Sequence, residues 1–322
     1  MTVWAAVDRR LFAEGEASRL AIVRAGLAGL LGLRIALGPF AGLGGQPAAL
    51  FDPPALLGWL PQMPSRSAIL AVQMVGVAAA VAAVARWKPR VTFAVAWACL
   101  LLLAGLKDSL GKILHNDVLL LLAAVPLLGA PADSRPGEPT RSARFGWPVE
   151  ATVVVVAVAY FTSGARKLAS SGLDWITGDT MRWIMYQAAA GDRAPTDAVA
   201  RAVADRPWLA TTVAAGIVAL ELSAPLVLVS RRFRPWFAAA AVAFHTGTWL
   251  TLGLDYWAWA VVVLLVLPGW GRLSGRRRQP SAPERRRAAA DRATEAIDAA
   301  AASATTASAI RPAPVRSTQS DS

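Results

Sequence analysis

The sequence contains one cysteine, Cys99, and it lies inside an apolar run. A lone cysteine excludes an internal disulfide, a cysteine zinc site and a CxxC redox pair. Charged residues are also scarce: they make up 17% of the 322 residues, whereas 55% are hydrophobic. A soluble domain usually has about a quarter of its residues charged, so this balance is unlike a soluble globular protein. No metal site is expected.

Long apolar runs take the place of the missing charges. A helix needs about 20 largely apolar residues to cross a hydrocarbon core of roughly 30 Å. Several runs meet that length, and residues 253–255 supply a turn that divides the last long run into two. The sequence predicts an all-α membrane protein, a polytopic bundle of about eight transmembrane helices in contact with membrane lipids. The predicted spans are residues 20–39, 68–85, 91–106, 114–128, 149–167, 209–230, 236–252 and 256–268, of which the fourth and eighth are short.

Basic residues gather in alternate connections between the predicted spans. Because lysine and arginine are enriched in cytoplasmic loops, this pattern predicts a multi-pass protein of the cell membrane with both termini in the cytoplasm. Three regions follow: a cytoplasmic segment over residues 1–19, a transmembrane domain over 20–270, and a disordered basic cytoplasmic tail over 271–322. The net charge of +12 does not indicate nucleic acid, since no basic stripe alternates with aromatic residues. The clusters are Arg9, Arg10 and Arg19; Arg86, Lys88 and Arg90; Arg135, Arg141 and Arg144; Arg231, Arg232 and Arg234; and the arginines of the tail.

Ionisable residues lie inside several of the predicted spans. Such a group costs several kcal/mol unless it is paired or hydrated, so each is a candidate functional residue. Glu221 and His245 lie in the middle of consecutive, antiparallel spans, where a contact between them would lower the cost of burying both. That pair is either a proton relay or a contact that fixes helix packing. Arg34 is predicted to form an ion pair or to bind an anion near the outer side.

Two further candidates lie at the predicted outer ends of spans. Lys167 ends the fifth span, where it either snorkels toward the lipid head groups or acts as a base in an apolar site. His115 opens the fourth span, either as part of that site or as an interfacial histidine beside the helix cap of Asn116 and Asp117. If the fourth and fifth helices are adjacent, His115 and Lys167 share one outward-facing pocket.

An ordered set of short motifs runs along the chain. The main one is Tyr160-Phe161-x-x-Gly164-x-x-Lys167-Leu168, followed by Trp175-x-x-Gly178; the others are Leu33-Arg34-Ile35-x-x-Gly38, His115-Asn116-Asp117, and Glu221 with Phe244-His245. In this order they resemble the HTTM family, the transmembrane region shared with vitamin K-dependent gamma-glutamyl carboxylase. The resemblance covers roughly residues 18–270.

The resemblance implies a catalytic base at Lys167, a supporting histidine at His115, and reduced menaquinone or vitamin K as the cofactor. In that chemistry the deprotonated hydroquinone reacts with O₂ to give a strong base, which removes a carbon-bound proton before CO₂ adds. The chain ends in a short polar tail where the carboxylase has a large lumenal portion, so a small or secreted peptide substrate is expected.

Two alternatives stay open at this point. The first is a non-enzymatic maturation, export or immunity factor for a secreted peptide. The second is a proton-coupled transporter that uses Glu221 and His245 as its relay, although no inverted repeat favours it.

Overall fold

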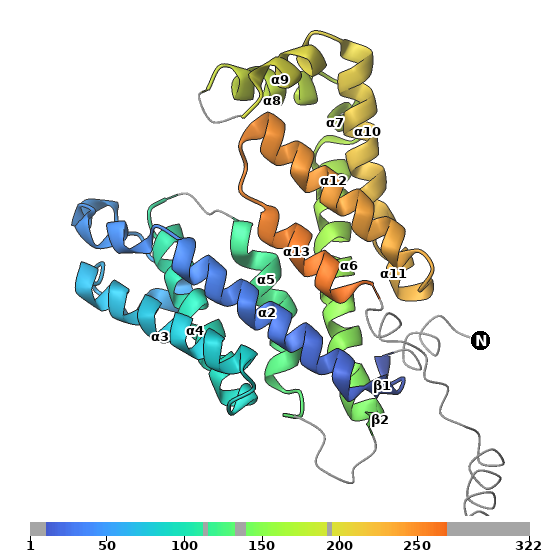
Figure 1. Ribbon diagram of the computed structural model, residues 1–322. Helices are drawn as coiled ribbons and strands as arrows, with labels where there is room; N and C mark the ends of the chain where they lie inside the picture. The colour runs from blue at the N-terminus through green and yellow to red at the C-terminus, as the bar shows by residue number, and fades with distance from the viewer. Residues whose placement is uncertain (1–10, 112–114, 133–139, 192–194, 269–322) are drawn as a thin grey trace, which may run out of the picture. The chain divides into compact units, whose positions relative to one another are not determined.

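The structure is a computed structural model that describes residues 11–111, 115–132, 140–191 and 195–268 (Figure 1). This part of the chain is mostly helical. One short antiparallel pairing joins β1 (Gly15–Glu16) to β2 (Arg141–Ser142), with Gly15 opposite Ser142. The predicted cytoplasmic tail after residue 270 lies outside the described residues.

Helices coincide with all eight predicted spans. Four of them are long and apolar enough to cross a membrane, within the described residues: α2 with the turn that follows it (Ala17–Gly45), α3 (Arg66–Val84), α4 (Pro89–Asp108) and α6 (Ala143–Ser171). The remaining segments contain α5 (Val118–Leu128), α10 (Pro207–Ser223), α12 (Arg234–Leu252) and α13 (Trp257–Val266). Four apolar helices therefore indicate a membrane protein, and the count of eight spans stays a prediction.

Short elements fill the connections between these helices. The loop after α2 contains three 3₁₀ turns, η1 (Phe40–Gly45), η2 (Ala48–Leu50) and η3 (Ala55–Leu57), and η4 (His115–Asp117) precedes α5. Between α6 and α10 lie α7 (Asp174–Thr177), α8 (Thr180–Ala189) and α9 (Asp197–Ala204), while α11 (Leu226–Val229) leads into α12. Gly253, at φ 63°, ends α12 in the left-handed conformation that glycine adopts without steric cost, so the predicted turn is present.

Two apolar clusters hold the described helices together. The larger includes Leu27, Leu31, Phe93 and Leu100, all fully buried among α2 to α6 and α13. The smaller joins α8, α9 and α10 through residues such as Met185. Large apolar side chains also face outward, including Met74, Val81 and Trp236. Because soluble surfaces rarely expose so many large apolar groups, these outer faces indicate contact with membrane lipids.

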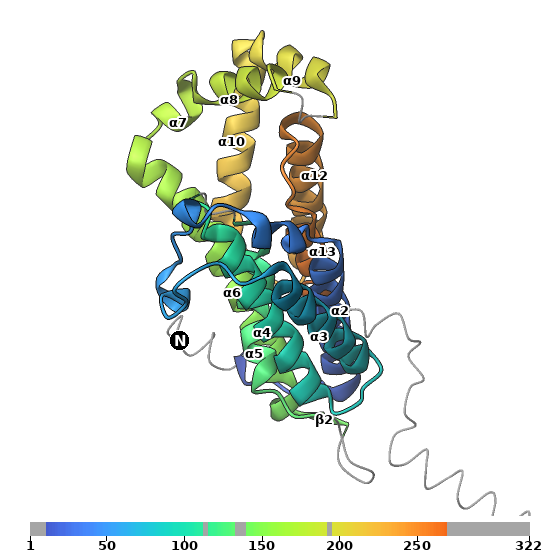
Figure 2. The same cartoon turned by 90° about the vertical axis from the view of Figure 1, so that its left-hand side faces the viewer.

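The 29-residue helix α6 positions the candidate site. Its N-terminal half packs on α5, where the Thr152 hydroxyl donates to the Ala123 carbonyl, and its C-terminal half packs on α10 at Gly164 (Figure 2). Glu150, Val153, Ala157, Tyr160 and Gly164 follow one another at intervals of three or four residues along its buried face. This spacing places them in one stripe along the helix.

Candidate functional site

Lys167 and Glu221 form an ion pair between α6 and α10. The Lys167 Nζ donates to Glu221 Oε1 at 2.7 Å and to Oε2 at 2.8 Å. The Ser163 hydroxyl joins them: it accepts from Lys167 Nζ at 2.9 Å and donates to Glu221 Oε1 at 2.9 Å. The Glu221 side chain is 4% exposed and that of Lys167 is 24% exposed, so the pair is reached from the lysine side.

The local sequence explains how the two helices bring this pair together. Ser163 and Lys167 are four residues apart, which places their side chains on one face of α6. At Gly164, between them, a Cβ atom would lie 2.8 Å from the Cβ of Glu221, so only glycine allows the observed approach of α10. On the exposed side, Lys167 Nζ lies 5.3 Å from the ring centre of Trp175, within the range of a cation–π contact.

A second buried polar pair lies further along the same stripe of α6. The Tyr160 hydroxyl is 2.6 Å from His245 Nε2, and both side chains are buried. Rings surround this pair: Tyr160 contacts Phe237 and Trp259, with ring centres 5.3 and 5.7 Å away. The other ring nitrogen of His245, Nδ1, is buried without a hydrogen-bond partner among the described residues.

These two pairs replace the predicted contact between Glu221 and His245. Glu221 on α10 is hydrogen-bonded to Lys167 and Ser163, while His245 on α12 is hydrogen-bonded to Tyr160. The two residues do lie on consecutive helices, but α6 supplies a separate partner to each. The prediction missed this because it weighed each span only against its neighbour in sequence.

His115 lies apart from the lysine pair. Its side chain is exposed in η4, and its backbone carbonyl accepts a hydrogen bond from Trp259 Nε1 at 3.1 Å. Among the described residues, the hydrogen-bond partners of the Lys167 side chain are Ser163 and Glu221. No hydrogen bond joins His115 to Lys167 among the described residues, and η4 packs on α5 and α13.

Arg34 forms a buried ion-pair cluster of its own. Its Nε and Nη2 atoms donate to the two carboxylate oxygens of Asp117 at 2.6 and 3.2 Å, and Nη1 donates to Asp255 at 2.7 Å. The guanidinium also lies 5.4 Å from the ring centre of Trp257. The cluster ties α2 to the start of α5 and to the turn before α13. Paired with two carboxylates, Arg34 has no excess positive charge with which to attract an anion.

A fourth polar cluster, which the sequence motifs did not predict, lies in the N-terminal half of α6. Glu150 pairs with Arg234 at 2.6 Å, and both side chains are buried. Glu150 lies at the start of a predicted span, on the same predicted side of the membrane as the connection that carries Arg231, Arg232 and Arg234. An acidic residue on that side could have been recognised as a candidate partner for these arginines. Glu150 and Arg234 are 84 residues apart in the sequence, so their pairing is visible only in the folded chain, where the start of α12 meets α6.

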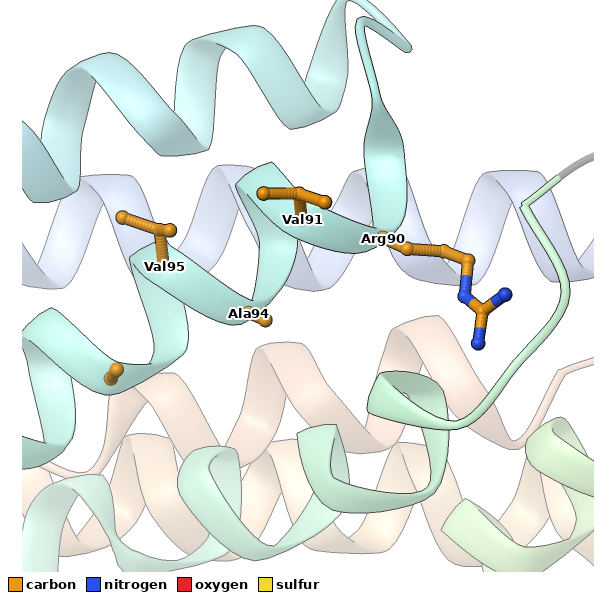
Figure 3. A pocket seen from close by; sticks show the side chains of 5 residues that line it. Arg90, Val91, Ala94 and Val95 are labelled. Atoms are coloured by element: carbon orange, nitrogen blue, oxygen red, sulfur yellow. The ribbon is translucent and has the colours of Figure 1, made fainter.

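A pocket elsewhere contains none of the candidate residues. It is an open, largely apolar groove along α4, lined by Arg90, Val91, Ala94, Val95 and Ala98 (Figure 3). No group of three or more histidine, cysteine, aspartate or glutamate side chains placed to hold a metal ion occurs within the described residues. The Lys167–Glu221 pair therefore stands as the candidate site because of its charges and its access.

No protein-family model matches the chain, and searches of curated proteins and of solved structures return no match either. The resemblance to the HTTM family stays a prediction that depends on the motifs.

Proposed function

We propose that the chain is an HTTM-type protein of the cell membrane, with cytoplasmic termini, whose Lys167–Glu221 pair accepts a proton from a reduced quinone. The observation that carries the proposal is a lysine held on a buried carboxylate, with about a quarter of its side chain accessible. Ion pairs inside a membrane are costly and mark functional sites more often than ordinary surface pairs do. The motif Gly164-x-x-Lys167 forms one wall of this pair.

The residues around the pair fit a lipophilic hydroquinone. Such a ligand has a flat ring with two acidic hydroxyl groups on a long apolar tail. Glu221 offers a proton acceptor, Lys167 a cation, and Trp175 a ring beside them. The neighbouring Phe161 side chain is 41% exposed and offers apolar surface. A reduced menaquinone or vitamin K bound here would supply, together with O₂, the strong base that the resemblance implies.

In this proposal each side chain has a separate task. A charged lysine has no lone pair, so the group that first accepts a hydroxyl proton is the Glu221 carboxylate. Lys167, whose side chain is partly accessible, would then stabilise the negative charge left on the ligand. Lys167 itself could act as the base only by the other route, in which its proton passes to an unprotonated Glu221 across 2.7 Å before the ligand gives up its own. Ser163 holds the carboxylate in place.

The test uses the purified full chain with reduced menaquinone and O₂, and the formation of quinone epoxide is measured. We expect epoxide from the wild type, and a loss of at least about a hundredfold in Lys167→Met and Glu221→Gln, the range for removing a general base. Arg166→Met is the matched control, because it removes the neighbouring positive charge from an exposed position. No epoxide from a folded sample with menaquinone or vitamin K would overturn the proposal.

The proton-transporter alternative is favoured by one observation, the buried Tyr160–His245 pair one helical turn from Ser163. It predicts proton uptake by proteoliposomes that is lost in His245→Ala. A maturation or export factor would retain its activity in all of these variants.

A further inference from the structure

The ion-pair cluster at the N-terminal half of α6 has more positive than negative charge. We call it the Glu150 cluster, and it consists of Glu150, Arg19, Arg231 and Arg234. At its centre, Arg234 donates to both oxygens of Glu150 at 2.6 and 3.2 Å and to the Val227 carbonyl at 2.9 Å. The Arg234 side chain is 3% exposed. This bidentate pair uses one acceptor position on each oxygen of the carboxylate.

Arg19 and Arg231 lie on the accessible side of this pair. Each has one guanidinium nitrogen 3.6 Å from the same Glu150 oxygen, which is attraction without a hydrogen bond. Their side chains are 21% and 51% exposed. The other acidic group that acts on Arg19 is Glu16, an exposed residue that accepts a hydrogen bond from Ser18. Arg19 also donates from Nη2 to the Val266 carbonyl at 3.4 Å. Among the described residues, three guanidinium groups therefore face two carboxylates, and one positive charge is left over.

Exposed apolar side chains flank Arg231 along the chain. Leu226 and Val229 of α11, just before Arg231, are 47% and 51% exposed, and Trp236 at the start of α12 is 75% exposed. Tryptophan is enriched where a membrane helix meets the head groups. Partly accessible guanidinium groups thus occur together with exposed apolar side chains in this part of the chain, and a phospholipid presents a phosphate and acyl chains that could bind to both.

We propose that Arg19 and Arg231 bind the phosphate of an anionic phospholipid head group, with the Arg234–Glu150 pair as the fixed base of the site. Guanidinium groups bind phosphate through paired N–H donors, and basic pockets between membrane helices on the cytoplasmic side hold anionic head groups. Arg19, Arg231 and Arg234 belong to the segments that the charge pattern predicts to be cytoplasmic. The site is independent of the quinone chemistry proposed for Lys167.

The test measures which lipid stays bound to the full chain. The purified protein is incubated with mixed micelles that contain phosphatidylglycerol and phosphatidylcholine, and native mass spectrometry counts the retained lipids. We expect phosphatidylglycerol to be preferred, and its affinity to fall about tenfold in Arg231→Gln, the effect of one charge-assisted hydrogen bond. Arg19→Gln should weaken it similarly. Arg141→Gln is the control: it removes an exposed arginine, 65% accessible, that pairs with Glu14 and not with the cluster.

Three results would overturn the proposal. The first is equal retention of phosphatidylglycerol by the wild type and by both cluster variants. The second is an equal loss in Arg141→Gln, which would indicate attraction by net charge alone. The third is displacement of the lipid by millimolar inorganic phosphate, which would show that a free anion is the ligand.

Discussion

Two buried carboxylates, one near each end of α6, have different partners. Glu150, in the N-terminal half, is surrounded by three arginines and contacts one of them directly. Glu221 faces the C-terminal half and has one lysine and one hydroxyl. Seventeen residues separate Glu150 from Lys167 along the helix, or about 25 Å at 1.5 Å per residue. One helix thus carries two ion pairs whose separation is close to the roughly 30 Å thickness of a hydrocarbon core.

The difference between arginine and lysine separates their roles. Arginine keeps its proton at any physiological pH, so the Glu150 cluster holds a fixed positive charge that suits anchoring and anion binding. Lysine can give up its proton when its surroundings favour the neutral form, so the Lys167–Glu221 pair is able to move one. The direct partners of the two carboxylates also differ in exposure, because Arg234 is 3% exposed and Lys167 is 24% exposed.

The largest effect is expected at Arg234. Replacing it by methionine leaves Glu150 buried without its direct partner, and removing one member of a buried pair costs about 3–5 kcal/mol. Unfolding of the purified protein in mixed micelles should show this loss. Glu150→Leu combined with Arg234→Leu is the control, since removal of both charges should restore much of the stability. If Arg234→Met alone is as stable as the wild type, the cluster has no structural role.

A smaller loss is expected at the other pair. Lys167→Met leaves Glu221 with Ser163 and with water from the accessible side, so about 1–3 kcal/mol should be lost, the cost of an unsatisfied buried group. Glu221→Gln should be milder, because the neutral amide still bonds with Ser163. The same unfolding assay compares them. If Lys167→Met costs as much as Arg234→Met, the two ends of α6 do not differ as proposed.

The apolar pattern of the sequence predicted the helices well, because a long apolar helix is formed by one continuous run of apolar residues. The turn at Gly253 was predicted for the same reason: its signal is local. The short helices α5 and α13 mark the limit of this approach, since ten or eleven residues are below the length of a span and hydropathy does not fix their role.

The partners of the buried charges were harder to predict. Glu221 and Lys167 were both predicted as candidate residues, but their pairing was not. The pairing depends on the close approach of α6 and α10 at Gly164, and the spacing of residues in a sequence does not indicate which helices are in contact. The ion-pair partners of Arg34 could not be named from the sequence, because Asp117 and Asp255 are 83 and 221 residues away along the chain. Glu150 was missed because it lay at a predicted boundary, where a charge needs no explanation.

The glycine between the two helices gives a sharper test of the lysine pair. In Gly164→Ala the new methyl group would lie 2.8 Å from the Cβ of Glu221, so α10 must shift. Overpacking of this kind costs about 1–3 kcal/mol. Gly216→Ala is a matched control on α10, because a Cβ atom there would meet nothing within 4 Å and alanine is the better helix former by about 1 kcal/mol. Epoxide formation should fall in Gly164→Ala and stay unchanged in Gly216→Ala.

The smallest effect is expected at the Tyr160–His245 pair, which contains no formal charge when the histidine is neutral. Tyr160→Phe removes one hydrogen bond of 2.6 Å and keeps the ring contacts with Phe237 and Trp259, so about 1 kcal/mol of stability should be lost. Tyr186→Phe serves as the control, since its hydroxyl bonds to Asp205 at an exposed position and should matter little. If Tyr160→Phe abolishes proton uptake by proteoliposomes while its stability changes only slightly, the pair conducts protons and the transporter alternative replaces the quinone site. If uptake is absent in the wild type as well, the pair is a packing contact, and proton transfer is confined to the lysine end of α6.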